Sequence, residues 1–168
     1  FRIFTTADAY AVSNNLHRSY IPNALFHLKQ NNWITPIRRG IYALNSIFLG
    51  STPIHEFEIA MALSKNIYIS HFSAFHHHGL TDQIPHGVYA SVPTHTSLPR
   101  KKNGETSRLL NIPYHFTQMK KSHFFGLKNV WVGDLKISIS GMEKTLLDGL
   151  TKPQYCGGMR EVLEGFRR

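Results

Sequence analysis

The segment from Trp33 to Leu44, Trp-Ile-Thr-Pro-Ile-Arg-Arg-Gly-Ile-Tyr-Ala-Leu, constrains the fold of this chain more than any other. β-Branched residues lie on both sides of Arg39-Gly40, where the glycine can take the positive φ that a tight turn demands. Pro36 is compatible with an edge strand only. We therefore expect a two-stranded hairpin with two arginines at its tip, and a plain surface hairpin is the alternative interpretation.

Two short helices are expected ahead of this hairpin. Thr5 or Thr6 can cap the first, which runs through Val12 with Asp8 in its first turn. Residues 13–15 break it. The second helix is expected to begin near Pro22 and to end at Gln30 or Asn31, with apolar residues at helical spacing at Ala24, Leu25 and Leu28. Helix, turn, helix and hairpin is the order of a winged helix-turn-helix.

In a winged helix-turn-helix the second helix enters the major groove of DNA. Asn23 could bond adenine, Arg18 could reach guanine or a phosphate, and an exposed turn has no folding reason to carry two adjacent arginines. A solvated polar helix face is the alternative for each helical position. The candidate DNA-binding residues are Arg18, Ser19, Tyr20, Asn23, His27, Arg38 and Arg39.

The charge of the chain agrees with a nucleic-acid partner. Residues 1–45 carry five Lys and Arg against one acidic residue, which gives +4, and the remaining 123 carry fourteen against nine, which gives +5. The total of +9 favours nucleic acid or another anionic partner. Basicity alone would equally fit association with a ribosome or a membrane surface.

Length and composition indicate a two-domain globular protein of the α+β class. The 168 residues leave room for a winged helix-turn-helix domain at 1–48 and a mixed α/β domain at 54–168, joined by a connector rich in small residues. No apolar run approaches the roughly 20 residues that span a bilayer. The single Cys156 excludes an internal disulfide. We expect a cytoplasmic protein, and we expect a further helix of the winged fold ahead of Phe1.

The second domain is expected to alternate helices and strands around one polar loop. We expect a capping box at Ser140 and Glu143 that opens a helix through Leu146, Leu147 and Leu150, and Ser70 as the cap of an earlier helix. The predicted helices are 55–64, 70–80, 140–150 and 159–166; the predicted strands are 67–69, 88–92, 111–116, 130–132 and 135–139; the polar and mobile loop is 93–108.

Three separated blocks of this sequence resemble the AbiEi family of abortive-infection antitoxins. They are the segment from Tyr68 to Pro85, which includes Ser-His-Phe-Ser-Ala-Phe-His-His-His-Gly-Leu, then Glu-Lys-Thr-Leu-Leu-Asp at 143–148, and Gly157-Gly158. The family also begins with a winged helix whose wing is similar to Arg-Gly-Ile-Tyr at 39–42. The resemblance covers essentially the whole chain. Many members continue past the point that corresponds to Arg168, so it leaves open that the antitoxin domain continues there.

The resemblance implies a transcriptional regulator of a type IV toxin-antitoxin system. Such a protein would bind inverted repeats of double-stranded DNA in its own promoter and repress its own operon. Two copies of the protein would occupy one inverted repeat. Its functional counterpart would be a nucleotidyltransferase-like toxin, which it opposes without a stable complex. From the residues themselves we expect no cofactor and no catalytic activity, because no convergent set of catalytic groups can be identified.

Two other functions are compatible with the residues. A metal-dependent nuclease would use a cluster of Asp134, Glu143, Lys144 and Asp148 with Lys136, although each acidic residue has a structural explanation in a turn, a cap or a helix-face pair. A protein-interaction module would use the basic surface without DNA. The histidines at 71 and 76–78 lack metal-ligand spacing, and an inert packed Cys156 is the simpler interpretation of that residue, so we expect no metal site.

Overall fold

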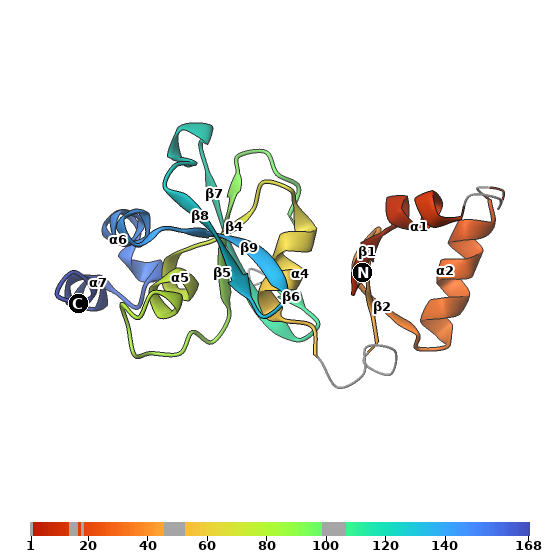
Figure 1. Cartoon of the computed structure of the whole chain (residues 1–168), viewed down its shortest axis with the longest axis horizontal. Coiled ribbons are helices and arrows are strands. Elements are labelled where there is room, and N and C mark those ends of the chain that lie inside the picture. The colour runs from red at the N-terminus through yellow and green to blue at the C-terminus, as the bar shows by residue number, and fades with distance from the viewer. Residues whose placement is uncertain (1, 14–16, 18, 46–52, 99–106) are drawn as a thin grey trace. The chain divides into compact units, whose positions relative to one another are not determined.

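The computed structural model describes the chain except for residues 1, 14–16, 18, 46–52 and 99–106 (Figure 1). The described residues form six α-helices and two sheets, so the protein belongs to the predicted α+β class. The chain divides into two compact units, Phe1–His55 and Glu56–Arg168, which we call unit 1 and unit 2. The expected connector lies at the end of unit 1, and most of it falls outside the described residues.

Unit 1 contains an antiparallel sheet of three strands. The order is β1 (Ile3–Thr5), β3 (Ile41–Leu44) and β2 (Ile34–Arg38). The predicted hairpin is therefore present as β2 and β3, with Gly40 at a φ of +79° in the turn. Pro36 lies on the edge strand, as expected. The short strand β1, which the sequence does not predict, pairs with the other side of β3.

The helices of unit 1 are α1 (Thr6–Val12) and α2 (Tyr20–Gln30). Thr5 caps α1 through a capping box, in which its hydroxyl accepts the Asp8 N–H at 3.2 Å and Asp8 Oδ2 accepts the Thr5 N–H at 2.7 Å. This reciprocal pair satisfies two N–H groups that a helix start leaves without partners.

The second helix, α2, begins two residues before the predicted start, so Pro22 is its third residue rather than its first. Its buried side chains are Ile21 and Leu25, with Leu28 packed beside them. Ala24 is exposed, so its assignment to the apolar face is wrong. Ile21 lies four residues before Leu25 and seven before Leu28, which is the spacing of one helix face.

Unit 2 is built on a mixed sheet of six strands. The order is β6 (Ser107–Leu109), β7 (Ile112–Met119), β5 (Val88–Pro93), β4 (Tyr68–Ile69), β9 (Leu135–Ser140) and β8 (Leu127–Val132). The β5–β7 and β4–β9 pairs are parallel, and the others are antiparallel. The predicted polar loop, 93–108, overlaps β5 and β6 at its ends, and its central part lies outside the described residues.

Helices lie on both sides of the sheet of unit 2 (Figure 1). The helix α4 (Glu56–Leu63) lies against one face, and α5 (His71–His77), α6 (Met142–Thr151) and α7 (Met159–Gly165) lie on the opposite side. Single 3-10 turns, η1 (Lys121–His123) and η2 (Pro153–Tyr155), precede β8 and α7. Phe75 of α5 and Val162 of α7 are fully buried between these helices.

The predicted cap of α6 is wrong, and the predicted cap of α5 is right in its position but makes no capping hydrogen bond. Gly141, not Ser140, precedes α6, and no side chain caps that helix. The Ser140 hydroxyl instead lies 2.7 Å from Thr145 Oγ1, and Glu143 is exposed. Ser70 does occupy the position before α5, but its hydroxyl contacts the buried side chains of His71 and Ser91 rather than the helix backbone. Buried hydroxyls favour these partners because they have no water to bond.

The predicted helix through Leu146, Leu147 and Leu150 is present as α6, but two of these leucines lie outside its buried face. Leu147 and Leu150 are 49% and 42% exposed, whereas Lys144 and Asp148 are only 3% and 4% exposed. Thr145 and Gly149 complete the buried face. Lys144 and Asp148 form an ion pair on this face, which offsets their charges. Gly149 on the same face leaves space for the Phe75 ring.

Candidate nucleic-acid interface

The exposed face of α2 carries half of the described candidate residues. At about 100° of rotation per residue, Asn23 and His27 lie roughly 200° and 240° around the helix from Ile21. They therefore point away from the core that Ile21 and Leu25 form with Ile34. Tyr20 is 62% exposed and lies on the same side. Geometry thus leaves these polar groups available to a partner that lies along α2.

The start of α2 is organised by His17 and Ser19. The Tyr20 N–H donates to the His17 carbonyl at 2.9 Å, and the Ser19 hydroxyl lies 2.8 Å from His17 Nδ1. Both side chains are exposed. Arg18, between them, falls outside the described residues. The exposed Ser19 hydroxyl at this helix start is a group that could contact a phosphate.

The hairpin turn is held against the first helix. Arg38 ends β2 and is half-buried, whereas Arg39 is exposed in the turn. The Gly40 carbonyl accepts the Thr6 N–H at 2.9 Å, which fixes the turn at the start of α1. Since α1 has seven residues, it separates the turn from the segment leading to α2 by about 10 Å. The candidate residues therefore form two groups, one at each end of α1.

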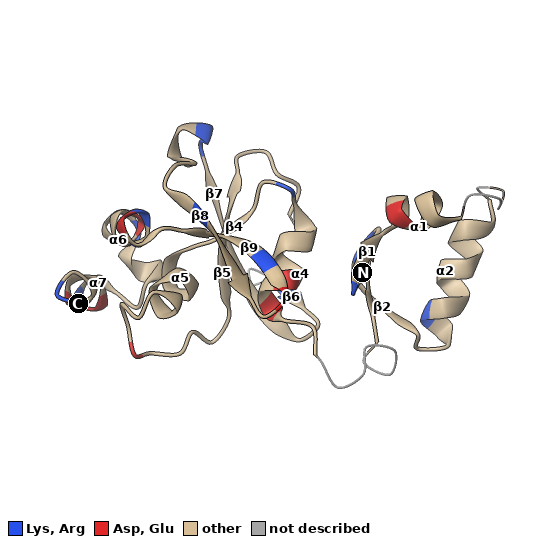
Figure 2. Cartoon of the chain, in the orientation of Figure 1, with Lys and Arg blue, Asp and Glu red and all other residues tan. Residues whose placement is uncertain are grey.

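Unit 1 offers one negative charge to set against its cations. Asp8 is the only acidic residue among residues 1–55. Its carboxylate is occupied by the backbone N–H and hydroxyl of Thr5, which hold the pKa of Asp8 below its ordinary value. Figure 2 shows acidic colour in this unit on α1 alone, with basic colour on α2 and near β1. No residue of α2 is acidic, and the one carboxylate of unit 1 lies in the first turn of α1, beside the hairpin turn.

Sequence reasoning missed two exposed residues beside this surface. Phe26 is 56% exposed, lies on the outer face of α2 and packs edge-on against His27, with ring centroids 5.8 Å apart. His17 contacts Ser19 at the helix start. Phe26 does not fit the spacing of Ile21, Leu25 and Leu28, and that mismatch is the signal by which the sequence could have identified it.

The residues of the nuclease alternative have separate structural positions. Asp134 is exposed in the β8–β9 turn, and Glu143 is exposed in the first turn of α6. Asp148 is paired with Lys144. In the described part of the chain, no three His, Cys, Asp or Glu side chains are placed to hold a metal ion together.

His71, His78 and Cys156 of unit 2 are integrated into its packing, whereas His76 and His77 are exposed. His71 is fully buried, and His78 Nε2 donates to the Ser140 carbonyl at 2.7 Å. Cys156 is buried as predicted, and this burial, followed by the charge of Asp148, raises the pKa of its thiol to about 12. A thiol with this pKa is not a nucleophile at neutral pH.

Comparison of the chain with known protein families gives no match, and a search of curated proteins gives none either. The resemblance to AbiEi antitoxins therefore stays a prediction that depends on the quoted motifs. No helix among the described residues has the length and apolar character needed to cross a bilayer.

Proposed function

We propose that the protein is a DNA-binding transcriptional regulator whose unit 1 is a winged helix-turn-helix. The observation that carries this proposal is the order β1-α1-α2-β2-β3 with β3 at the centre of the sheet, combined with a polar outer face on α2. In a winged helix-turn-helix the second helix is the recognition helix, and the strand pair after it forms the wing.

The two groups of candidate residues have different roles in this proposal. The eleven residues of α2 form a helix about 16 Å long. Its diameter with side chains, about 10–12 Å, fits the width of the major groove, roughly 12 Å. Asn23 would read adenine, with His27 one turn further along, while Ser19 and Tyr20 would contact phosphates. Arg38 and Arg39 would bind phosphate or enter the minor groove. Arg18 would act with Ser19 and Tyr20, the residues at the start of α2.

The antitoxin role is the part of the proposal that depends on the family resemblance. The resembling blocks fall on β4 and α5, on α6, and immediately before α7, and Phe75 packs between these helices. The three blocks thus lie on elements that pack against one another in unit 2, which supports the interpretation that they belong to one domain core rather than to unrelated surface segments. The regulator would then repress its own operon from inverted repeats, with two copies on the DNA, and oppose a nucleotidyltransferase-like toxin without a stable complex. No described residue favours the nuclease or the interaction module over this role.

The assignment of roles is tested by DNA-binding titrations on the segment upstream of the protein's own gene and on a scrambled duplex. Replacing Arg38 and Arg39 by Ala should weaken binding to both duplexes to a similar degree, because phosphate contacts carry no sequence information. Asn23→Ala should lower the ratio of specific to nonspecific binding by roughly 5- to 150-fold, the equivalent of about 1–3 kcal/mol for one bidentate base contact.

Lys29→Ala is the control for a change on α2 that affects charge alone, since Lys29 is exposed in the last turn of α2, far from its start, and the substitution removes one positive charge. It should leave the specific-to-nonspecific ratio unchanged. An unchanged ratio in Asn23→Ala, or a ratio lowered as much by Lys29→Ala, would contradict the proposed orientation of α2.

A further inference from the structure

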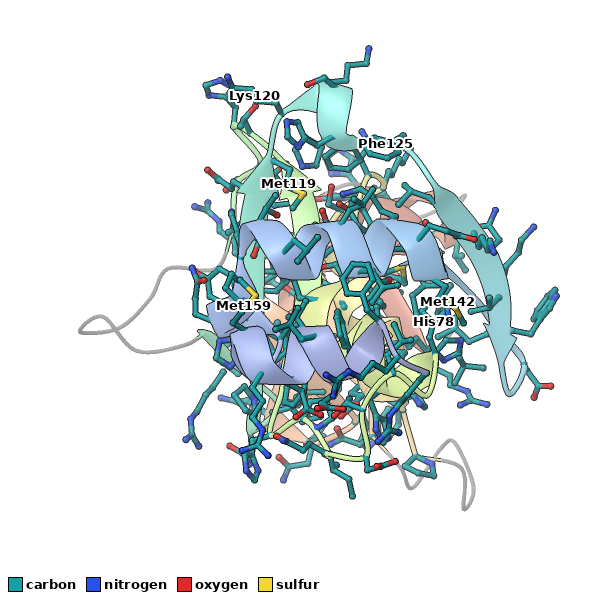
Figure 3. All side chains as sticks on the ribbon, turned by 90° about the vertical axis from the view of Figure 1, so that its left-hand side faces the viewer. His78, Met119, Lys120, Phe125, Met142 and Met159 are labelled. Atoms are coloured by element: carbon teal, nitrogen blue, oxygen red, sulfur yellow. The ribbon has the colours of Figure 1, made fainter. Side chains whose placement is uncertain are left out.

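A cavity of about 470 Å³ lies beside α6 in unit 2, and we call it the α6 cavity. The segment that leads from β7 through η1 forms one wall, and α6 forms the other. Figure 3 shows Met119, Lys120 and Phe125 together along one edge of α6. A volume of several hundred Å³ is typical of sites for small ligands. The lining residues are Gln118, Met119, Lys120, His123, Phe125, Lys144, Leu147, Asp148, Thr151 and Lys152.

The charge of the α6 cavity is positive. Lys144 and Asp148 form an ion pair and offset each other's charge, so Lys120 and Lys152 determine the net charge of the lining. Lys152 and Lys144 also depress the pKa of the neighbouring buried His71, after desolvation, so their field extends into the interior. A concave surface with this excess of ammonium groups attracts an anion.

The remaining lining is apolar and aromatic. The Phe125 ring is 52% exposed, and the Lys144 ammonium lies 5.0 Å from its centroid. Leu147 is 49% exposed beside it, and both side chains leave apolar surface in contact with water. An aromatic face of this kind is a platform on which a planar base can stack. Inorganic phosphate alone would leave this surface and most of the cavity unfilled.

One carboxylate oxygen in the lining residues lacks a partner. Asp148 Oδ1 accepts from Lys144, but Oδ2 is buried without a hydrogen bond among the described residues. Buried carboxylate oxygens are normally bonded, so an oxygen without a donor favours a ligand that brings hydroxyl or amino hydrogens to this wall. Ribose hydroxyls and the amino groups of bases are donors of this type.

From these three features we propose that the α6 cavity binds a nucleoside monophosphate, with its phosphate on Lys120 and Lys152 and its base on Phe125. The site lies wholly within unit 2 and does not depend on the proposed DNA-binding role of unit 1. The same phosphate and base chemistry is found in a free nucleotide and at the phosphorylated end of a nucleic-acid strand.

Calorimetric titration of the full chain with AMP, UMP, adenosine and inorganic phosphate tests this proposal. The monophosphates should bind at least tenfold more tightly than either adenosine or phosphate, because only they use both parts of the site. A 5′-phosphorylated dinucleotide distinguishes the two sources: tighter binding than the monophosphates assigns the site to a strand end, and equal or weaker binding assigns it to a free nucleotide.

Two substitutions separate the contributions of charge and stacking. Lys120→Ala with Lys152→Ala should weaken the binding of both phosphate and AMP about tenfold or more. Phe125→Leu should weaken AMP by about tenfold, within the range of one base–aromatic stack, while phosphate binding stays unchanged. Lys120→Gln alone, at an exposed position, provides the same test of charge if the other variants unfold.

Lys65→Ala with Lys121→Ala is the matched control, because these two lysines line a separate cavity of about 700 Å³ and their loss changes the net charge equally. AMP binding should survive in this control. The proposal is wrong if no monophosphate binds at millimolar concentration, or if the control variant loses AMP binding while the Lys120 and Lys152 variant retains it.

Discussion

At the scale of the residue, His71 is the most constrained side chain of unit 2. It is fully buried with a left-handed φ of +49°, and its Nδ1 lies 2.9 Å from the Ser70 hydroxyl. Burial first, and then the charges of Lys152 and Lys144, lower its pKa to about 3. The imidazole is therefore neutral in the folded protein at every pH at which the protein is ordinarily handled.

This neutral histidine predicts a pH dependence of stability. Between pH 6.5 and about 3 the unfolded chain binds a proton at His71 that the folded protein does not, so the free energy of unfolding decreases as pH falls through this window. The slope for one group is at most about 1.4 kcal/mol per pH unit. Urea unfolding of the wild type should thus lose about 2 kcal/mol from this group between pH 6.5 and pH 5.

His71→Asn should remove this contribution, because Asn tolerates a left-handed backbone and does not titrate. The exposed His76→Asn serves as the control and should keep the wild-type slope. Parallel pH profiles for wild type and His71→Asn would show that His71 does not titrate with the proposed shift.

Individual side chains differ in how far the sequence predicts their environment. The exposure of Asn23 and His27 follows from helical spacing against a buried stripe. The burial of Lys144 and Asp148 does not, since a pair four residues apart usually marks an exposed helix face. The segment around Phe125 and Gly126 lies against Lys144, and this tertiary contact shields the pair from solvent.

At the scale of the element, α6 shows how one glycine determines which helix face is buried. A Cβ at Gly149 would lie 2.9 Å from Phe75 Cζ and 3.2 Å from Val162 Cγ2. Gly149 therefore allows α5, α6 and α7 to approach around the Phe75 ring. The close approach selects the buried face of α6 over the face with Leu147 and Leu150.

Gly149→Ala should destabilise the protein despite the better helix propensity of alanine. The propensity gain is about 1 kcal/mol, whereas overpacking a close-packed core costs roughly 1–3 kcal/mol, so we expect a net loss of about 1 kcal/mol. Chemical denaturation measures this loss.

A Phe75→Leu background provides the control for this prediction. The smaller side chain should reduce the cost of Gly149→Ala by at least 0.5 kcal/mol, the lower end of the range for coupled neighbours. A stabilising Gly149→Ala, or a cost that is independent of Phe75, would contradict this packing account.

Elements with strong local signals are the ones that the sequence predicts. The β2–β3 and β8–β9 hairpins have a glycine in a tight turn between β-branched runs. The strands β1 and β6 have three residues each, too few for a pattern, and they form because a neighbouring strand offers an open edge. The Ser140 cap fails because its hydroxyl finds a buried partner in Thr145.

At the scale of the whole molecule, the α+β class follows from the alternation of helical and strand patterns. The order β6-β7-β5-β4-β9-β8 does not, because the two parallel pairs join segments that are far apart in the sequence. The α6 cavity is likewise a product of tertiary packing, since its lining comes from the end of β7, the η1 region and α6.

Specific recognition of duplex DNA is tested most directly by measuring the affinity of the full chain for its own upstream DNA and for a scrambled duplex across a salt series. We predict that the upstream DNA binds at least about a thousandfold more tightly at physiological salt. The logarithm of affinity should fall linearly with the logarithm of salt concentration, by about 0.9 for each phosphate contact. Equal affinity for both duplexes, or the absence of binding at low salt, would contradict the proposed function.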